Sequence, residues 1–205
     1  MKKLLLLAFS IIPFFCFSQG SLSQAAAQQY TVINDNAFID RDDLRIFNLF
    51  EKFYQETLNS DKGEMSAKTV DEIKTIMADN NFPNRNLLEI LLMYQDQLRL
   101  MAERNEKPNS SFQILTTDVL ATQSEKIYGK VPVLIQIYKG ETFMVAYMDD
   151  KAQSIFKEIL VTNTDCIPAR VYNCILTKDK AEKKRLLDAL KKERPNHWMV
   201  KQFLK

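Results

Sequence analysis

The chain has 205 residues, of which 46% are hydrophobic and 26% are charged, and its formal net charge at pH 7 is +2. This composition excludes an intrinsically disordered protein, because the chain holds enough apolar residues to form a core. It also argues against a glycine-rich phosphate-binding loop, because the whole sequence contains only four glycines.

The N-terminus has the features of a bacterial secretory signal, in the expected order. Lys2 and Lys3 supply positive charge, residues 4–17 form a nearly unbroken apolar run, and Cys16 and Ser18 place small side chains before a cleavage site. The run is shorter than the roughly 20 residues of a transmembrane helix. We therefore expect residues 1–18 to be cleaved, which leaves a periplasmic or secreted protein that is soluble and has no integral membrane segment.

Cleavage would change how the charge of the chain is interpreted. Without Lys2 and Lys3 the net charge is zero, but residues 19–170 carry 16 basic and 22 acidic side chains, whereas residues 171–205 carry 10 and 4. Such a division predicts either an acidic partner for the tail or a tail that folds back on the acidic body.

The mature chain is long enough for one well-packed domain. We expect a flexible leader over residues 19–40 and a single globular domain over residues 41–205. Within this domain we expect a helical part, an α/β part, and a disulfide loop followed by a basic helical tail, at residues 41–107, 110–160 and 161–205, respectively.

Several segments carry the periodicity of helices. Residues 85–104 are apolar on nearly all sides at first and amphipathic later, which is typical of a helix that starts in the core and reaches water. Residues 180–193 place Leu186, Leu187 and Leu190 on one side and lysines on the other. Both ends of the domain are therefore predicted to be helical.

The middle of the chain shows a different pattern. Residues 112–116, 131–138 and 143–148 are short runs rich in β-branched and aromatic residues, and Gly140 lies in a turn-like segment between the last two. We predict a β-hairpin near residues 131–148 within a small central sheet. The expected fold class is therefore a helix-rich α+β domain.

Two alternative folds remain open. The order of strands and helices over residues 112–160, with Val131-Pro132 before the hairpin, resembles the C-terminal half of a thioredoxin-like domain. That resemblance implies a thioredoxin-like core, but without thiol exchange, because the sequence has no Cys-x-x-Cys motif. The other alternative is an all-α helical repeat, because helices are predicted at both ends.

Cys166 and Cys174 are the two cysteines of the expected mature chain, and export exposes them to oxidising conditions. We predict a structural disulfide between them. One regular helix would separate their Cα atoms by about 12 Å, whereas a disulfide allows about 7 Å. The bond therefore requires a bend, for which Pro168 is a candidate.

No set of catalytic, cofactor-binding or metal-ligating residues can be assembled from local sequence. The single histidine, His197, has no neighbouring nucleophile or ligand and is expected to be a surface or packing residue. The best candidate binding surface is basic and consists of Lys183, Lys184, Arg185, Lys191, Lys192 and Arg194. Its expected partner is another protein or an acidic envelope component, and export argues against nucleic acid.

These observations favour an exported binding protein without catalytic activity or cofactor, such as an inhibitor or immunity-type protein. Two other functions remain open. One is a small secreted hydrolase that uses scattered Asp and Glu residues, which would show carboxylates with raised pKa in a pocket. The other is a helical-repeat scaffold, which would contain no sheet.

Overall fold

The computed structural model describes residues 40–107 and 109–204, and this part of the chain contains helices and connecting loops but no strand. The predicted signal over residues 1–18 and nearly all of the predicted leader lie outside the described residues. None of the described helices is long and apolar enough to span a membrane.

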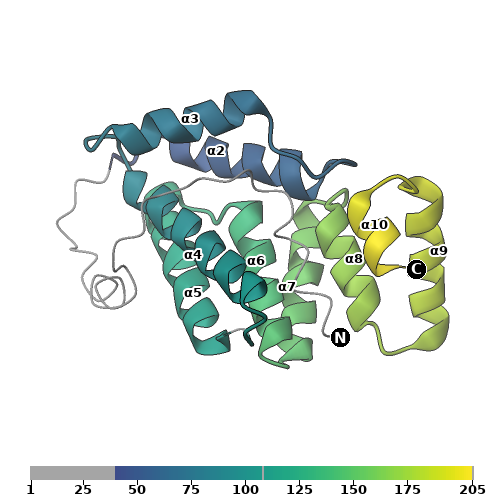
Figure 1. Ribbon diagram of the computed structural model, residues 1–205. Coiled ribbons are helices and arrows are strands. Elements are labelled where there is room, and N and C mark those ends of the chain that lie inside the picture. The colour runs from purple at the N-terminus through teal and green to yellow at the C-terminus, as the bar shows by residue number, and fades with distance from the viewer. Residues whose placement is uncertain (1–39, 108, 205) are drawn as a thin grey trace.

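Six helices stand side by side in a row that forms most of the molecule (Figure 1). Each packs against the next one along the chain, and their short connecting loops make neighbours antiparallel. In chain order they are α4 (Arg85–Glu103), α5 (Ser110–Tyr128), α6 (Val133–Val145), α7 (Asp149–Thr162), α8 (Ile167–Leu176) and α9 (Lys180–Glu193).

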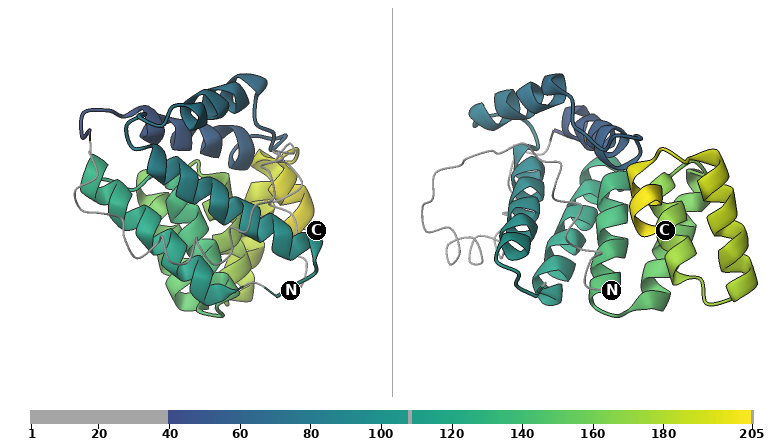
Figure 2. Two further views of the ribbon diagram at one scale, coloured as in Figure 1. Left: turned by 60° about the vertical axis from the view of Figure 1, so that its left-hand side comes forward. Right: turned by 45° about the vertical axis from the view of Figure 1, so that its right-hand side comes forward.

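The remaining helices lie outside the row, across the upper ends of its helices and beside its last members (Figure 2). They are α2 (Arg45–Phe53), its π-helical continuation η1 (Tyr54–Leu58), α3 (Ala67–Ala78) and α10 (Trp198–Phe203). Helix α10 packs against α8, and its Trp198 bonds through its backbone N–H to the carbonyl of Asp61 (3.2 Å) and through Nε1 to that of Thr57 (3.1 Å). The two ends of the described chain thus meet in one hydrophobic core.

The predicted β-hairpin is wrong, because residues 133–145 form helix α6 at the centre of the row. Its neighbours α5 and α7 cover opposite sides and α2 lies across it, so its apolar residues surround the helix rather than follow one stripe. Such a helix gives the same apolar run as a buried strand. Its first turn is fixed by Glu51, whose carboxylate accepts a hydrogen bond from the Val133 N–H at 2.7 Å.

The predicted strand at residues 112–116 is also wrong, because it lies within helix α5. Asn109 caps this helix by accepting a hydrogen bond from the Phe112 N–H (3.1 Å). The β-branched Thr116 and Thr117 donate their hydroxyls to the backbone carbonyls of Phe112 and Gln113, each at 2.8 Å. These bonds satisfy the two buried threonines without a sheet.

The third predicted strand, residues 143–148, is also wrong, because it is the end of α6 and the turn that follows. Neither the α+β class nor a thioredoxin-like core therefore fits the described chain. The all-helical alternative does fit. At the two ends the sequence was informative: the segments predicted at 85–104 and 180–193 are the helices α4 and α9, with bounds that agree within one residue.

Candidate functional site

A cluster of polar aromatic contacts joins alternate helices of the row. The helices α4, α6 and α8 alternate along the chain with α5 and α7, and side chains form hydrogen bonds between them. We call the residues that do so the tyrosine cluster; they are Tyr94 and Gln95 of α4, Tyr138, Glu141 and Thr142 of α6, and Tyr172 of α8.

Three hydrogen bonds hold the tyrosine cluster together. The hydroxyl of Tyr94 lies 3.3 Å from that of Thr142, and Gln95 Nε2 donates to the Tyr138 hydroxyl at 3.0 Å. On the other side of α6, the Tyr172 hydroxyl donates to Glu141 Oε1 at 2.7 Å. The rings of Tyr94 and Tyr138 also contact each other, with centroids 5.5 Å apart.

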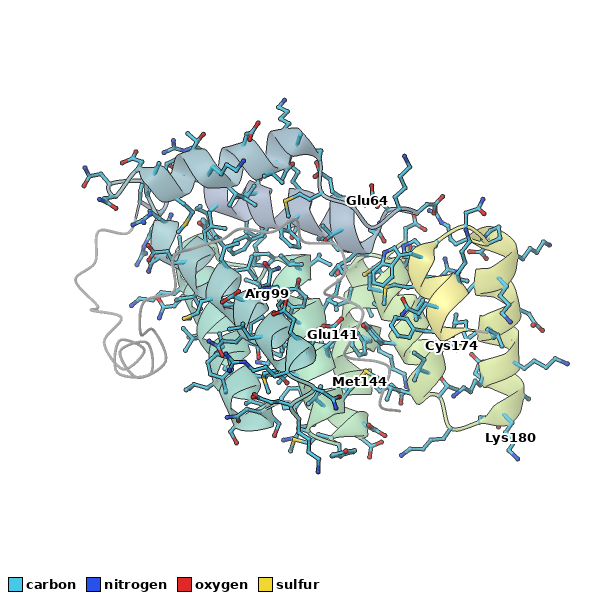
Figure 3. All side chains as sticks on the ribbon, in the orientation of Figure 1. Glu64, Arg99, Glu141, Met144, Cys174 and Lys180 are labelled. Carbon is cyan, nitrogen blue, oxygen red and sulfur yellow. The ribbon has the colours of Figure 1, made fainter. Side chains whose placement is uncertain are left out.

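Glu141 is the ionisable carboxyl of this cluster (Figure 3). It is half-buried, and desolvation raises its pKa to about 7, although the hydrogen bond from Tyr172 acts in the opposite direction. No ion pair joins it to a lysine or arginine among the described residues. Arg99 of α4, also labelled in Figure 3, pairs with Asp96 and Glu103. A carboxyl whose pKa lies near neutrality is a candidate for acid–base or switching roles.

Glu51 is a second carboxyl whose pKa is raised by burial, with the Val133 hydrogen bond and the charge of Lys130 opposing that effect. Its contact is with the first turn of α6, whereas Glu141 lies two turns further along the same helix. At a rise of 1.5 Å per residue, about 12 Å of helix separates the two positions. The two carboxyls with raised pKa thus contact α6 at positions about two turns apart.

The predicted basic surface lies on α9, the last helix of the row, and on the residue that follows it. All six predicted side chains are exposed. Two have partners: Lys183 Nζ donates to the Ile175 carbonyl (2.7 Å), and Arg185 pairs with Glu182 (2.7 Å). Within the described chain, no hydrogen bond or ion pair involves the side chains of the other four, Lys184, Lys191, Lys192 and Arg194.

Few ion pairs join the tail, residues 171–205, to the body among the described residues. Lys178 pairs with Asp150 at the start of α7 (2.8 Å), and Arg170 of α8 pairs with Glu193 (2.6 Å). Neither contact uses a residue of the basic surface. Folding back on the acidic body therefore accounts for Lys178 and leaves the basic surface facing solvent.

Cys166 and Cys174 are free and buried in this structure, so the predicted disulfide is not formed. Pro168 lies in the first turn of α8, where proline begins a helix instead of bending it. The straight helix keeps the thiols too far apart to bond. Burial raises the pKa of both thiols, which keeps them protonated and unreactive.

His197 is fully buried and packs in the core. Its Nδ1 accepts a hydrogen bond from the Met199 N–H (3.3 Å), which caps α10, and its ring stacks on Trp198. Burial lowers the pKa of the imidazole, so the residue is neutral at pH 7. Among the described residues no group of three or more His, Cys, Asp or Glu side chains could hold a metal ion.

No family model, no curated protein and no solved structure shows a significant match to this chain. The tyrosine cluster and the basic surface on α9 are therefore the features that indicate a function. Sequence patterns found the basic surface but missed the tyrosine cluster, because Tyr138, Glu141 and Thr142 share one face only if their segment is a helix.

Proposed function

We propose that this chain is an exported, non-catalytic interaction protein, a scaffold of stacked helices whose basic surface on α9 binds an acidic partner. The partner would be an acidic protein or an acidic component of the bacterial envelope. Export rests on the signal pattern of residues 1–18, and the mature chain would begin at Gln19.

The observation that carries this proposal is the set of four exposed cations without a partner in the described chain. Lys184, Lys191 and Lys192 lie on α9, and Arg194 follows its last turn. Asp188 interrupts the set, but basic side chains still outnumber acidic ones by six to three over Lys180–Glu193. Exposed charges keep their hydration, so they incur no desolvation cost, and they attract an opposite charge over about 10 Å at moderate salt.

The position of α9 at the end of the row also supports binding through its outer face. It packs mainly against α8 and buries Leu190 fully, and it is the last of the described helices in the row (Figure 1). A stacked-helix protein needs a polar outer face on its terminal helix to stay monomeric. A face that also carries an excess of one charge can select a partner of the opposite charge.

The test uses the mature chain and immobilised poly-L-glutamate as a carboxylate-bearing probe. Charge reversal at three positions, in the variant Lys184→Glu/Lys191→Glu/Lys192→Glu, should weaken binding by about tenfold or more, because attractions become repulsions worth some tenths of a kcal/mol each. Added salt should weaken wild-type binding in the same direction.

A matched control reverses three exposed lysines outside α9, at Lys62, Lys68 and Lys157. Both triple variants have the same net charge, so only a local surface distinguishes them. Equal loss in the two variants, or no loss in the α9 variant with an unchanged circular dichroism spectrum, would overturn the proposal.

A further inference from the structure

The row of helices is held together by two kinds of contact. Consecutive helices pack closely through apolar side chains, whereas the second neighbours α4, α6 and α8 are joined by the tyrosine cluster. On the α4 side two hydrogen bonds between neutral groups make the joint. On the α8 side the joint depends on Glu141, which is ionisable.

No other member of the tyrosine cluster changes charge near neutral pH. Tyr94 from α4, Tyr138 from α6 and Tyr172 from α8 all have a pKa raised above 10 by burial and stay neutral. Outside the cluster, Glu51 of α2 has a raised pKa but contacts the first turn of α6, and Lys151 of α7 lies over the ring of Phe143. From α5, Asp118 pairs with Lys139 (2.7 Å), and α7 presents the uncharged Phe156 to the ring of Tyr172. Glu141 is thus the one titrating group of this cluster between about pH 5 and 9.

The two protonation states of Glu141 differ in how well this environment suits them. The neutral acid accepts the Tyr172 hydrogen bond and needs no counter-charge. The carboxylate accepts a stronger bond from Tyr172, but it has no described cation within ion-pair distance and less water than it would have if α8 moved away. The loss of solvation is the larger of the two effects. Ionisation therefore favours states in which α6 and α8 separate.

We propose that Glu141 is a proton-controlled latch between α6 and α8: the protonated side chain holds the two helices together, and the ionised side chain loosens them. The direction follows from linkage. A carboxyl whose pKa is higher in the closed state than in the open state stabilises the closed state at low pH, and this stabilisation decreases as the pH rises from about 4.5 through 7.

The latch would act on the helix that carries the candidate binding surface, because α9 packs against α8. The proposal does not depend on what α9 binds. It requires only that local opening of α8 respond to the ionisation of one side chain.

Amide hydrogen exchange of the mature chain at pH 5.5 and 8.5, corrected for the intrinsic pH dependence of exchange, tests the latch. The opening constant of α8 should rise about thirtyfold between these pH values in the wild type, if the pKa of Glu141 falls from about 7 to its ordinary value on opening. In Glu141→Gln, which keeps an oxygen acceptor for Tyr172 and cannot ionise, the rise should disappear. The control Glu125→Gln, at an exposed position on α5, should keep it.

A direct titration keeps the proposal falsifiable even if Glu141→Gln fails to fold. Carbon NMR of the Glu141 carboxyl in the wild type should give a midpoint well above the ordinary value of about 4.5. A midpoint at the ordinary value would overturn the latch, as would equal pH dependence of α8 exchange in the wild type and Glu141→Gln.

Discussion

A missing methyl group at Gly140 determines how closely α6 and α7 approach each other. A Cβ at this position would lie 2.5 Å from Cζ of Phe156, which is buried in α7. The sequence suggested a turn at this glycine, but its role is a close contact between two helices. The same phenylalanine stacks on Tyr172, so this contact also supports the partner of Glu141.

Gly140→Ala should therefore destabilise the protein by about 1–3 kcal/mol, as an overpacked core does, in spite of the better helix propensity of alanine. Urea unfolding followed by circular dichroism measures the change. Combining Gly140→Ala with Phe156→Leu should recover about 1 kcal/mol relative to the sum of the single changes, because the smaller side chain makes room for the methyl group.

Gly129 provides the matched comparison. Its φ is +68°, and an added Cβ would meet no atom within 4 Å, so alanine there strains the backbone without a clash. Gly129→Ala should cost about 1 kcal/mol whether or not Phe156 is changed. Additive behaviour of Gly140→Ala with Phe156→Leu would contradict the contact.

At the scale of elements, α4 and α6 end in the same motif with different residues at the left-handed position. After α4 this position is Asn105 (φ 53°), with the Glu106 N–H bonded to the Met101 carbonyl at 2.8 Å. After α6 it is Tyr147 (φ 59°), with the Met148 N–H bonded to the Phe143 carbonyl at 2.8 Å. Asparagine suits this conformation, whereas tyrosine is strained in it.

Tyr147→Gly should stabilise the protein by about 0.5–1 kcal/mol, since relief of the left-handed strain exceeds the added entropy of the unfolded glycine. The tyrosine side chain is 82% exposed, so little packing is lost with it. Thermal unfolding should show a higher Tm for Tyr147→Gly and a change of only a few tenths of a kcal/mol for Asn105→Gly. A lower Tm for Tyr147→Gly would mean that the exposed ring makes stabilising contacts.

Differences between individual helices explain which of them the sequence could predict. The helices α4 and α9 have ends marked by composition and periodicity, and both were located correctly. Helix α6 has no polar face of the usual width, because neighbours cover it on several sides, and its apolar run was therefore mistaken for strands. A strand at residues 131–138 and a turn at Gly140 do not put Tyr138 and Glu141 on one face, so the sequence did not predict their cluster.

The candidate sites differ in the same way: one is marked in the local sequence, and the others depend on how the chain packs. A run of basic residues predicts an exposed surface from the sequence alone, and the basic residues of α9 are exposed. The state of Cys166 and Cys174 depends on whether their segment bends at Pro168, and the raised pKa of Glu141 depends on burial in the folded helical structure, where it contacts Tyr172 of α8. Neither property is local, so periodicity alone could not supply it.

At the scale of the whole molecule, stability should vary along the row of helices. Helix α6 has a close neighbour on each side and is crossed by α2, whereas α9 ends the row and packs mainly against α8. Stacks in which each helix contacts chiefly its neighbours open most readily at their ends. Their local opening free energies range from near zero at frayed elements to the global value in the core.

Hydrogen exchange at pH 5.5, where Glu141 is mostly protonated, should therefore show slowest exchange in α6 and faster exchange in α9, with opening free energies that differ by at least about 1 kcal/mol. Leu190 is the fully buried side chain of α9, so Leu190→Ala should widen the difference by destabilising α9 and leave α6 nearly unchanged. Equal protection of α6 and α9, both in the wild type and in Leu190→Ala, would mean that the row opens only as a single cooperative unit. In that case a latch confined to α6 and α8 could not act locally, and the pH dependence of Glu141 would appear in the global stability instead.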